Sequence, residues 1–197
     1  MKRDDRLGHH VLWHCAELAS SEHAWLVDDE EGHKLAGVAA LPLDDAPCHI
    51  SYEVMVDHQW APLAATATVT TAVQVSTIAL VSVGQGRWTL DATPSPLLDG
   101  CGDVDLGWTP ATNTIPIRRL ALEVGETAPI SAAWVRFPEL DVVTSEQRYT
   151  RLGDGRWRYQ SGDYDFELRT DVATGLVLAY GDDLWRVAAM AVGRPPT

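Results

Sequence analysis

Apolar and polar residues alternate with a period of two along most of this 197-residue chain. In His49–Asp57 the apolar side is formed by Ile50, Tyr52, Val54 and Val56, with mainly polar residues between them. Thr66–Thr77 alternates in the same way, with valines on one face and hydroxyl and amide side chains on the other. Because successive side chains of a β-strand point to opposite faces, this pattern predicts strands with one buried face.

Similar segments recur along the rest of the chain, and glycine-containing turns separate several of them. These further strands are predicted at Val11–Leu18, Ala24–Asp28, Lys34–Leu41, Ile78–Val83, Gly86–Leu90, Val104–Trp108, Ser131–Phe137, Val142–Tyr149, Arg156–Ser161, Tyr164–Thr170, Leu176–Tyr180 and Trp185–Met190. Strand twist makes an open sheet of more than about ten strands curl, split or close. We therefore expect a mainly β fold forming one domain over residues 1–197. It is a strongly curved antiparallel sheet, or incompletely closed β-barrel, of about 10–12 strands with one short helix.

That single helix is predicted at about residues 115–124, where apolar residues recur at helical spacing. Pro116 lies in the first turn, where its missing N–H costs nothing, and Asn113 or Thr114 can cap the helix. Gly125 suits the position just after the last turn. We expect the helix to cover an open end of the sheet or to fill its concave face.

Charge and composition narrow the classes of partner. The net charge of −13 disfavours nucleic acid and anionic membrane surfaces. No apolar run approaches the roughly 18–20 residues of an integral membrane segment. The three widely separated cysteines, Cys15, Cys48 and Cys101, are typical of a reducing compartment. The charged start, Met1–Arg6, is not followed by the apolar stretch of an export signal. Together these features predict a soluble, cytoplasmic protein.

Acidic and basic side chains are concentrated in residues 99–122. Asp103 and Asp105 are two residues apart on a predicted strand, so they face the same side, roughly 6.5–7 Å apart. This spacing suits a glycosidase-like acid pair or a divalent metal. Alternatively, the carboxylates pair with Arg118 and Arg119 or cap the helix, since buried charges need partners. We favour this structural network and predict no catalytic residue.

Candidate ligand contacts come from a polar loop and from tryptophans. Thr112 and Asn113 lie in the loop Thr109–Thr114, whose polar groups suit either sugar hydroxyls or turn and helix capping. Tryptophans combine a large apolar area with an N–H donor, which suits a core or a lined pocket. The candidates are Trp88, Trp108, Trp134, Trp157 and Trp185. The histidines lack metal-ligand spacing and no phosphate-binding loop is present, so we expect neither metal nor cofactor.

The segment from Gly100 to Leu120 resembles the signature of a bacterial family named putative glycolipid-binding. Its members share Gly-Cys-x-Asp-Val-Asp-Leu followed by Thr-Pro-x-Thr-Asn-Thr-Leu-Pro-Ile-Arg-Arg-Leu. This chain matches both stretches, with Ile115 in place of the leucine. The resemblance extends from Val11-Leu12-Trp13 to Leu184-Trp185-Arg186. It implies a fold similar to that of periplasmic lipoprotein carriers, in which a curved sheet wraps a helix and encloses an apolar cavity, and it brings no catalytic residues.

We favour a non-catalytic protein that binds a lipid, glycolipid or other amphiphilic small molecule in a cavity of the curved sheet. Burial of an alkyl chain contributes about 0.8 kcal/mol per CH₂, so shape alone supplies affinity. The first alternative is a small hydrolase or isomerase that uses Asp103 and Asp105 with Arg118. The second is a homodimeric interaction module that uses an exposed sheet edge.

Overall fold

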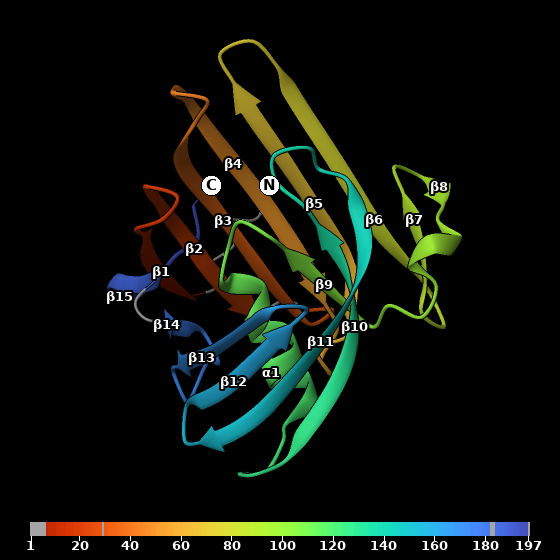
Figure 1. The fold of residues 1–197 in the computed structure, drawn as a ribbon, viewed down its shortest axis with the longest axis vertical. Coiled ribbons are helices and arrows are strands. Elements are labelled where there is room, and N and C mark those ends of the chain that lie inside the picture. The colour runs from red at the N-terminus through yellow and green to blue at the C-terminus, as the bar shows by residue number, and fades with distance from the viewer. Residues whose placement is uncertain (1–6, 29, 182–183, 197) are drawn as a thin grey trace.

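The computed structural model describes residues 7–28, 30–181 and 184–196. Within these ranges, fifteen strands form one sheet, in the spatial order β8-β7-β6-β5-β4-β3-β2-β1-β15-β14-β13-β12-β11-β10-β9 (Figure 1). Neighbouring strands are antiparallel except β9 and β10, which are parallel. The sheet is strongly curved, and its end strands β8 and β9 are not hydrogen-bonded to each other. This confirms the predicted fold class. Met1–Arg6, used in predicting that no export signal is present, lies outside the described residues.

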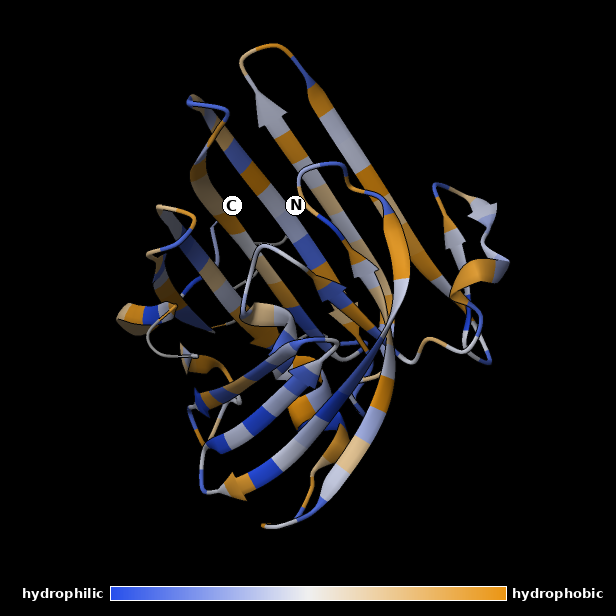
Figure 2. Ribbon diagram, viewed as in Figure 1, coloured by the Kyte–Doolittle hydropathy of each residue, from blue (hydrophilic) through white to orange (hydrophobic). Residues whose placement is uncertain are grey.

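The strands are β1 (Gly8–Cys15), β2 (Ser20–Asp28), β3 (His33–Leu43), β4 (Ala46–Val56), β5 (Pro62–Thr71), β6 (Val75–Gly84), β7 (Arg87–Leu90), β8 (Thr93–Pro94), β9 (Asp103–Leu106), β10 (Thr127–Val135), β11 (Val142–Gly153), β12 (Arg156–Ser161), β13 (Tyr164–Thr170), β14 (Val177–Tyr180) and β15 (Trp185–Gly193). The helical elements are the 3₁₀ turns η1 (Pro96–Leu98) and η2 (Ala111–Asn113) and the α-helix α1 (Thr114–Leu120). Figure 2 shows apolar and polar residues alternating along the strands, as the sequence predicted.

The prediction of a single strand over Thr66–Thr77 is wrong, because a tight turn divides this segment between β5 and β6. The Thr71 hydroxyl accepts hydrogen bonds from the backbone N–H groups of Val73 and Gln74 and so stabilises this turn. Valine alternation continues in step through the turn, so the pattern does not reveal it. This correction moves the start of β6 to Val75. The described residues also contain the two-residue strand β8, which the sequence did not indicate, and more strands than the ten to twelve expected.

The predicted helix is present but shorter than residues 115–124. It is entered through η2, and it ends where Ala121 takes a left-handed conformation with φ of +45°, four residues before Gly125. The predicted side-chain cap is not formed. Instead, the backbone N–H of Thr114 donates to carbonyls of η2, and the Asn113 amide donates to Pro110. Capping by a threonine or asparagine side chain is unnecessary where a 3₁₀ turn leads directly into the helix.

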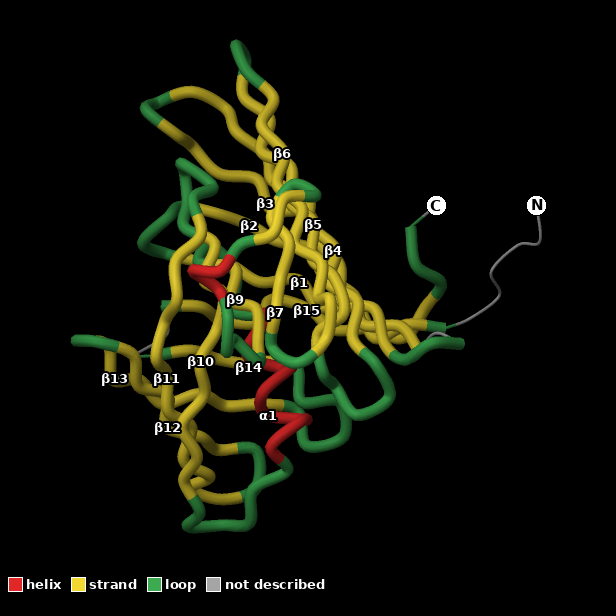
Figure 3. Tube along the Cα trace, turned by 90° about the vertical axis from the view of Figure 1, so that its right-hand side faces the viewer, coloured by secondary structure: helices red, strands yellow, loops and turns green. Residues whose placement is uncertain are grey.

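Two walls of the sheet enclose α1, as Figures 1 and 3 show from two directions. We call β1–β6 the N-terminal wall and β10–β13 the C-terminal wall. The inner face of the N-terminal wall packs against buried residues of the segment from η1 to α1, namely Leu98, Cys101, Val104, Leu106, Trp108, Ala111 and Ile115. This half of the concave face is therefore filled by the chain's own side chains. A smaller cluster around Ile117, Tyr149, Trp157 and Leu168 lies against the C-terminal wall.

The segment between β7 and β9 connects the two ends of the sheet without extending the sheet across the gap. The Gly100 N–H donates to the Gly86 carbonyl at 2.8 Å, and the Trp88 indole N–H donates to the Cys101 carbonyl at 2.9 Å. On the other side, the Gly102 N–H donates to the Ser131 carbonyl at 2.8 Å. These bonds fix the start of β9 between the two ends of the sheet. Val104 and Leu106 of β9 belong to the core of the N-terminal wall, whereas Asp105 accepts a hydrogen bond from Gln147 of β11.

Within the described ranges, neither α1 nor any other helix combines the length and apolarity needed to cross a bilayer.

Candidate ligand-binding site

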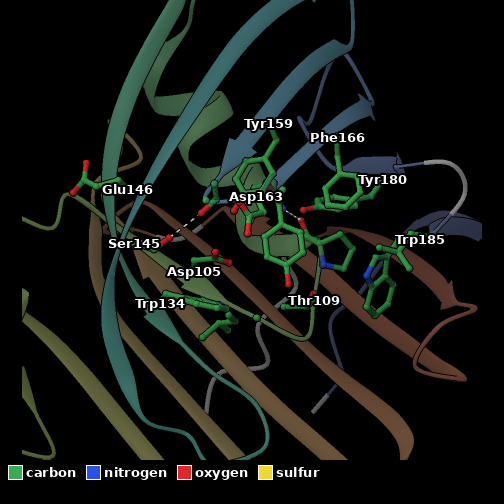
Figure 4. Close-up of a pocket in the computed structure, with 18 of the residues that line it drawn as sticks. Asp105, Thr109, Trp134, Ser145, Glu146, Tyr159, Asp163, Phe166, Tyr180 and Trp185 are labelled. Atoms are coloured by element: carbon green, nitrogen blue, oxygen red, sulfur yellow. Dashed lines mark hydrogen bonds between the residues drawn. The ribbon is translucent and has the colours of Figure 1, made fainter.

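A cavity of about 780 Å³ lies on the concave side of the C-terminal wall, next to η2 (Figure 4). Its volume is in the range of small-molecule sites. The cavity is bounded by β9 and the loop after it, by β10 to β13, and by the residues around β14 and β15. Six aromatic side chains line it: Trp134, Tyr159, Tyr164, Phe166, Tyr180 and Trp185. The open part of the concave face is thus rich in aromatic rings.

Strand register brings these rings together. Tyr159 of β12 is directly opposite Phe166 of β13, and Tyr180 of β14 is directly opposite Trp185 of β15. Residues directly opposite each other share a face of the sheet, so all four side chains point inward. The ring centroids of Phe166 and Tyr180 are 5.2 Å apart, and those of Tyr159 and Tyr180 are 6.0 Å apart. The result is a continuous aromatic surface.

Trp134 and Asp105 form the part of the cavity nearest to β9. They are direct partners in the parallel pairing of β10 with β9. A Cβ atom at Gly107 would lie 2.7 Å from the Trp134 indole nitrogen, so any other residue at this position would displace the indole ring. Gly107 therefore lets the indole lie against the loop that follows β9. The Trp134 ring and the Asp105 carboxylate therefore lie side by side in the lining of the cavity.

The Asp105 carboxylate is held by two uncharged side chains. It accepts hydrogen bonds from the Gln147 amide at 2.7 Å and from the Thr112 hydroxyl at 3.2 Å. Burial is the main cause that raises the pKa of Asp105 from 3.8 to about 6. Since a carboxylate can accept about four hydrogen bonds, Asp105 keeps acceptor capacity for a ligand.

The four charged residues predicted as one network occupy three separate environments. Asp103 is buried and accepts hydrogen bonds from the Arg119 guanidinium on both of its oxygens, whereas Asp105 contacts neither arginine among the described contacts. Arg118 instead donates to the Ala173 carbonyl at 3.1 Å, and its guanidinium lies 5.3 Å from the Trp60 ring centroid. Adjacent helical residues point about 100° apart, which is why the two arginines diverge.

The seven residues predicted as ligand contacts lie in different parts of the fold. Trp134, Trp185 and Asn113 line the cavity, and Thr112 is buried behind it as a partner of Asp105. Trp157 lines a second hollow of about 290 Å³ near the end of α1. Trp88 and Trp108 belong to the core against the N-terminal wall.

Sequence reasoning missed the four other aromatic residues of the cavity: Tyr159, Tyr164, Phe166 and Tyr180. Alternation in Arg156–Ser161 and Tyr164–Thr170 indicates which of their side chains share a face. It does not indicate that this face stays open while the inner face of the N-terminal wall is filled. That difference depends on where the segment from η1 to α1 lies, which is a tertiary property.

A buried glutamate on β2 supports the loop that forms one side of the cavity. Glu22 has no exposed surface, and it accepts hydrogen bonds from the Tyr52 hydroxyl at 2.5 Å and the Thr109 hydroxyl at 2.6 Å. Desolvation raises the pKa of Glu22 to about 7. Thr109 lines the cavity, and its hydroxyl also accepts the backbone N–H of Ala111 at 3.0 Å. Glu22 thereby fixes the shape of the loop without reaching the cavity.

Gly37 makes this network possible. A Cβ atom at this position would lie 2.6 Å from the Tyr52 hydroxyl oxygen. The absence of a side chain on β3 lets the Tyr52 ring cross over the strand toward Glu22 of β2. No local motif signals this arrangement, because Glu22 is 30 residues from Tyr52 and 87 residues from Thr109 along the chain.

Comparison with known proteins supports the assignment from residues 100–120. A crystal structure of a DUF1089 family protein from Pseudomonas aeruginosa has a TM-score of 0.75 and 29% sequence identity to this chain. The match covers 83% of this chain and 90% of that one. No protein of curated function was found to match. The family described as "Putative glycolipid-binding" matches residues 10–186, nearly the whole chain. This protein therefore belongs to the putative glycolipid-binding family.

Proposed function

We propose that this protein binds an amphiphilic small molecule, a glycolipid, in the cavity beside η2. The observation that carries the proposal is the aromatic lining of an unfilled cavity in a fold whose other concave half is filled. The family description points to the same class of ligand.

The cavity offers both kinds of contact that an amphiphile needs. The rings of Phe166, Tyr180 and Trp185 supply apolar area for an alkyl chain or for the C–H face of a sugar. Asp105 and Asn113 supply acceptors and donors for hydroxyl groups. Burying an eight-carbon chain contributes about 6 kcal/mol before the cost of association, which is enough for measurable binding.

The catalytic alternative gains no support from the geometry. It requires both carboxylates and Arg118 to face a substrate. Asp103 is 1% exposed and paired with Arg119, and it does not line the cavity. Arg118 lies against Trp60 instead. The homodimeric interaction module stays a prediction from the sequence.

The proposed function is tested by titrating the protein with octyl glucoside below its micelle concentration, following tryptophan fluorescence and calorimetric heat. We expect saturable binding by the wild type. Phe166→Ala removes a ring from the cavity and should weaken binding about tenfold. The chain has one other phenylalanine, Phe137, which is half-buried outside the cavity, so Phe137→Ala is the matched control. Absence of saturable binding, or equal weakening by the two variants, would overturn the proposal.

A further inference from the structure

The charged side chains around the cavity are all of one sign. Glu17, Asp105, Glu146 and Asp163 line it, and none of its described lining residues is lysine, arginine or histidine. In Figure 4, Glu146 points away from the others, whereas Asp105 and Asp163 lie among the aromatic rings. A concave site lined by one sign of charge attracts ligands of the opposite sign and repels those of the same sign.

The two arginines of β12 are placed on the outer face of the C-terminal wall. Arg151 of β11 faces inward, but it lines the second hollow near the end of α1 and donates to the Leu122 carbonyl at 2.8 Å. On β12, Arg156 and Arg158 alternate with the inward-pointing Trp157 and Tyr159. Arg156 donates to Glu167 at 2.9 Å, and Arg158 forms a two-point pair with Asp165. Period-two alternation therefore keeps these guanidinium groups on the side of the strand opposite to the cavity.

The arginine found near a ring of the cavity is also already paired. The Arg136 guanidinium lies 6.0 Å from the Trp134 ring centroid, and it forms a two-point pair with Asp141. It is not among the residues that line the cavity.

Asp105 is the carboxylate for which a ligand cation matters most. Its described hydrogen-bond partners, Thr112 and Gln147, are both uncharged. Asp103, its neighbour on the same face, has its charge balanced by Arg119. Asp105 is half-buried, and a carboxylate with reduced access to water is stabilised by a paired cation. Among the described contacts Asp105 has no such cation. The raised pKa of Asp105 agrees with this shortage.

We propose that the head group of the amphiphile carries an ammonium group that pairs with Asp105, and that the cavity rejects anionic head groups. This inference rests on the proposed function of the same cavity. Trp134, the direct neighbour of Asp105 in the sheet, adds a ring face to which an ammonium group is attracted. An amino sugar on an alkyl chain meets all of these requirements.

The test compares three octyl pyranosides that share one alkyl chain: the neutral glucoside, the glucosaminide and the glucuronide. The glucosaminide differs from the glucoside only by an amine at C2, and the glucuronide only by a carboxylate at C6. Titrations near pH 7 lie above the pKa of Asp105, which is about 6, so the carboxylate form of Asp105 predominates. A charge-assisted hydrogen bond predicts that the glucosaminide binds at least about tenfold more tightly than the glucoside. The glucuronide should bind more weakly than the glucoside.

Two matched variants assign the preference to a residue. Asp105→Asn should abolish the preference for the amine, measured as the ratio of the affinities for the glucosaminide and the glucoside. Asp165→Asn, the same substitution on the outer face of β13, should keep the preference. If Asp105→Asn does not fold, the order of the three wild-type affinities tests the ammonium assignment. Added salt should then weaken the binding of the glucosaminide more than that of the neutral glucoside.

The outcomes separate the two levels of the proposal. Equal affinities for glucoside and glucosaminide, or a preference that survives in Asp105→Asn, would overturn the ammonium assignment and leave amphiphile binding intact. If none of the three pyranosides binds, both proposals are overturned.

Discussion

Replacing Glu22 by glutamine should flatten the pH dependence of stability. The pKa of Glu22 is raised by burial from 4.5 to about 7 in the folded protein. Between these values, the folded state holds a proton that the unfolded state releases. Stability from this group is therefore fully present below pH 4.5 and is lost as the pH rises through about 7. Integrated from pH 5 to pH 8, the loss in free energy of unfolding is about 2.5 kcal/mol.

Glutamine removes the titration while keeping most of the geometry. Its carbonyl oxygen can accept the hydrogen bonds that Tyr52 and Thr109 donate to one oxygen of Glu22. The other oxygen of Glu22 has no partner among the described residues, so the glutamine NH₂ would be unsatisfied there. This costs about 1–3 kcal/mol at every pH. The informative quantity is therefore the difference in stability between pH 5 and pH 8.

The assay is urea-induced unfolding followed by tryptophan fluorescence at pH 5, 6, 7 and 8. Glu22→Gln should lose about 2.5 kcal/mol less than the wild type over this range. Glu31→Gln, at an exposed glutamate in the turn before β3, is the matched control and should follow the wild type. Identical pH dependence of the wild type and Glu22→Gln would refute the reasoning.

Three further predictions concern stability. Arg119→Ala leaves the buried carboxylate of Asp103 without its cation and should destabilise the protein by about 3–5 kcal/mol. Arg118→Ala removes one hydrogen bond and a contact with an aromatic ring at a more exposed position, so the expected loss is about 1 kcal/mol. Gly37→Ala places a methyl group 2.6 Å from the Tyr52 hydroxyl oxygen and should destabilise the protein by about 1–3 kcal/mol. Equilibrium unfolding measures all three.

The controls for these variants are available within the chain. Arg118→Ala serves as the control for Arg119→Ala, and equal losses would contradict the separation of the two arginines. Gly153→Ala is the control for Gly37→Ala, because a Cβ atom at Gly153 meets nothing within 4 Å. If Gly37→Ala is no less stable than Gly153→Ala, the close approach of Tyr52 is not a constraint on this position.

Much of the fold could be predicted from local pattern. Alternation located most strands because a half-buried strand repeats every two residues, and the signature from Gly100 to Leu120 identified the family. The pattern failed at Thr66–Thr77, since the turn after Thr71 keeps the valines in step. It also placed the end of the helix too late, because Ala121 takes the left-handed conformation more often found for glycine.

The residues that line the cavity were harder to predict from the sequence. They depend on which inner face of the sheet is covered by the segment from η1 to α1. Trp108 and Trp134 both lie in predicted strands, yet Trp108 packs in the core and Trp134 lines the cavity. Arg118 and Arg119 were predicted as parts of one network, but they point about 100° apart on the helix and have different partners. The role of Glu22 could not be predicted from the sequence, because its hydrogen-bond partners lie on other elements far along the chain.

Mass spectrometry of organic extracts tests amphiphile binding most directly. Wild-type protein and the Phe166→Ala and Phe137→Ala variants would be purified from the same host without detergent and extracted in parallel. The cavity predicts one amphiphile, present at a level approaching one molecule per chain in the wild type and Phe137→Ala and depleted in Phe166→Ala. Wild-type extracts that contain no more amphiphile than extracts of Phe166→Ala would contradict amphiphile binding in the cavity.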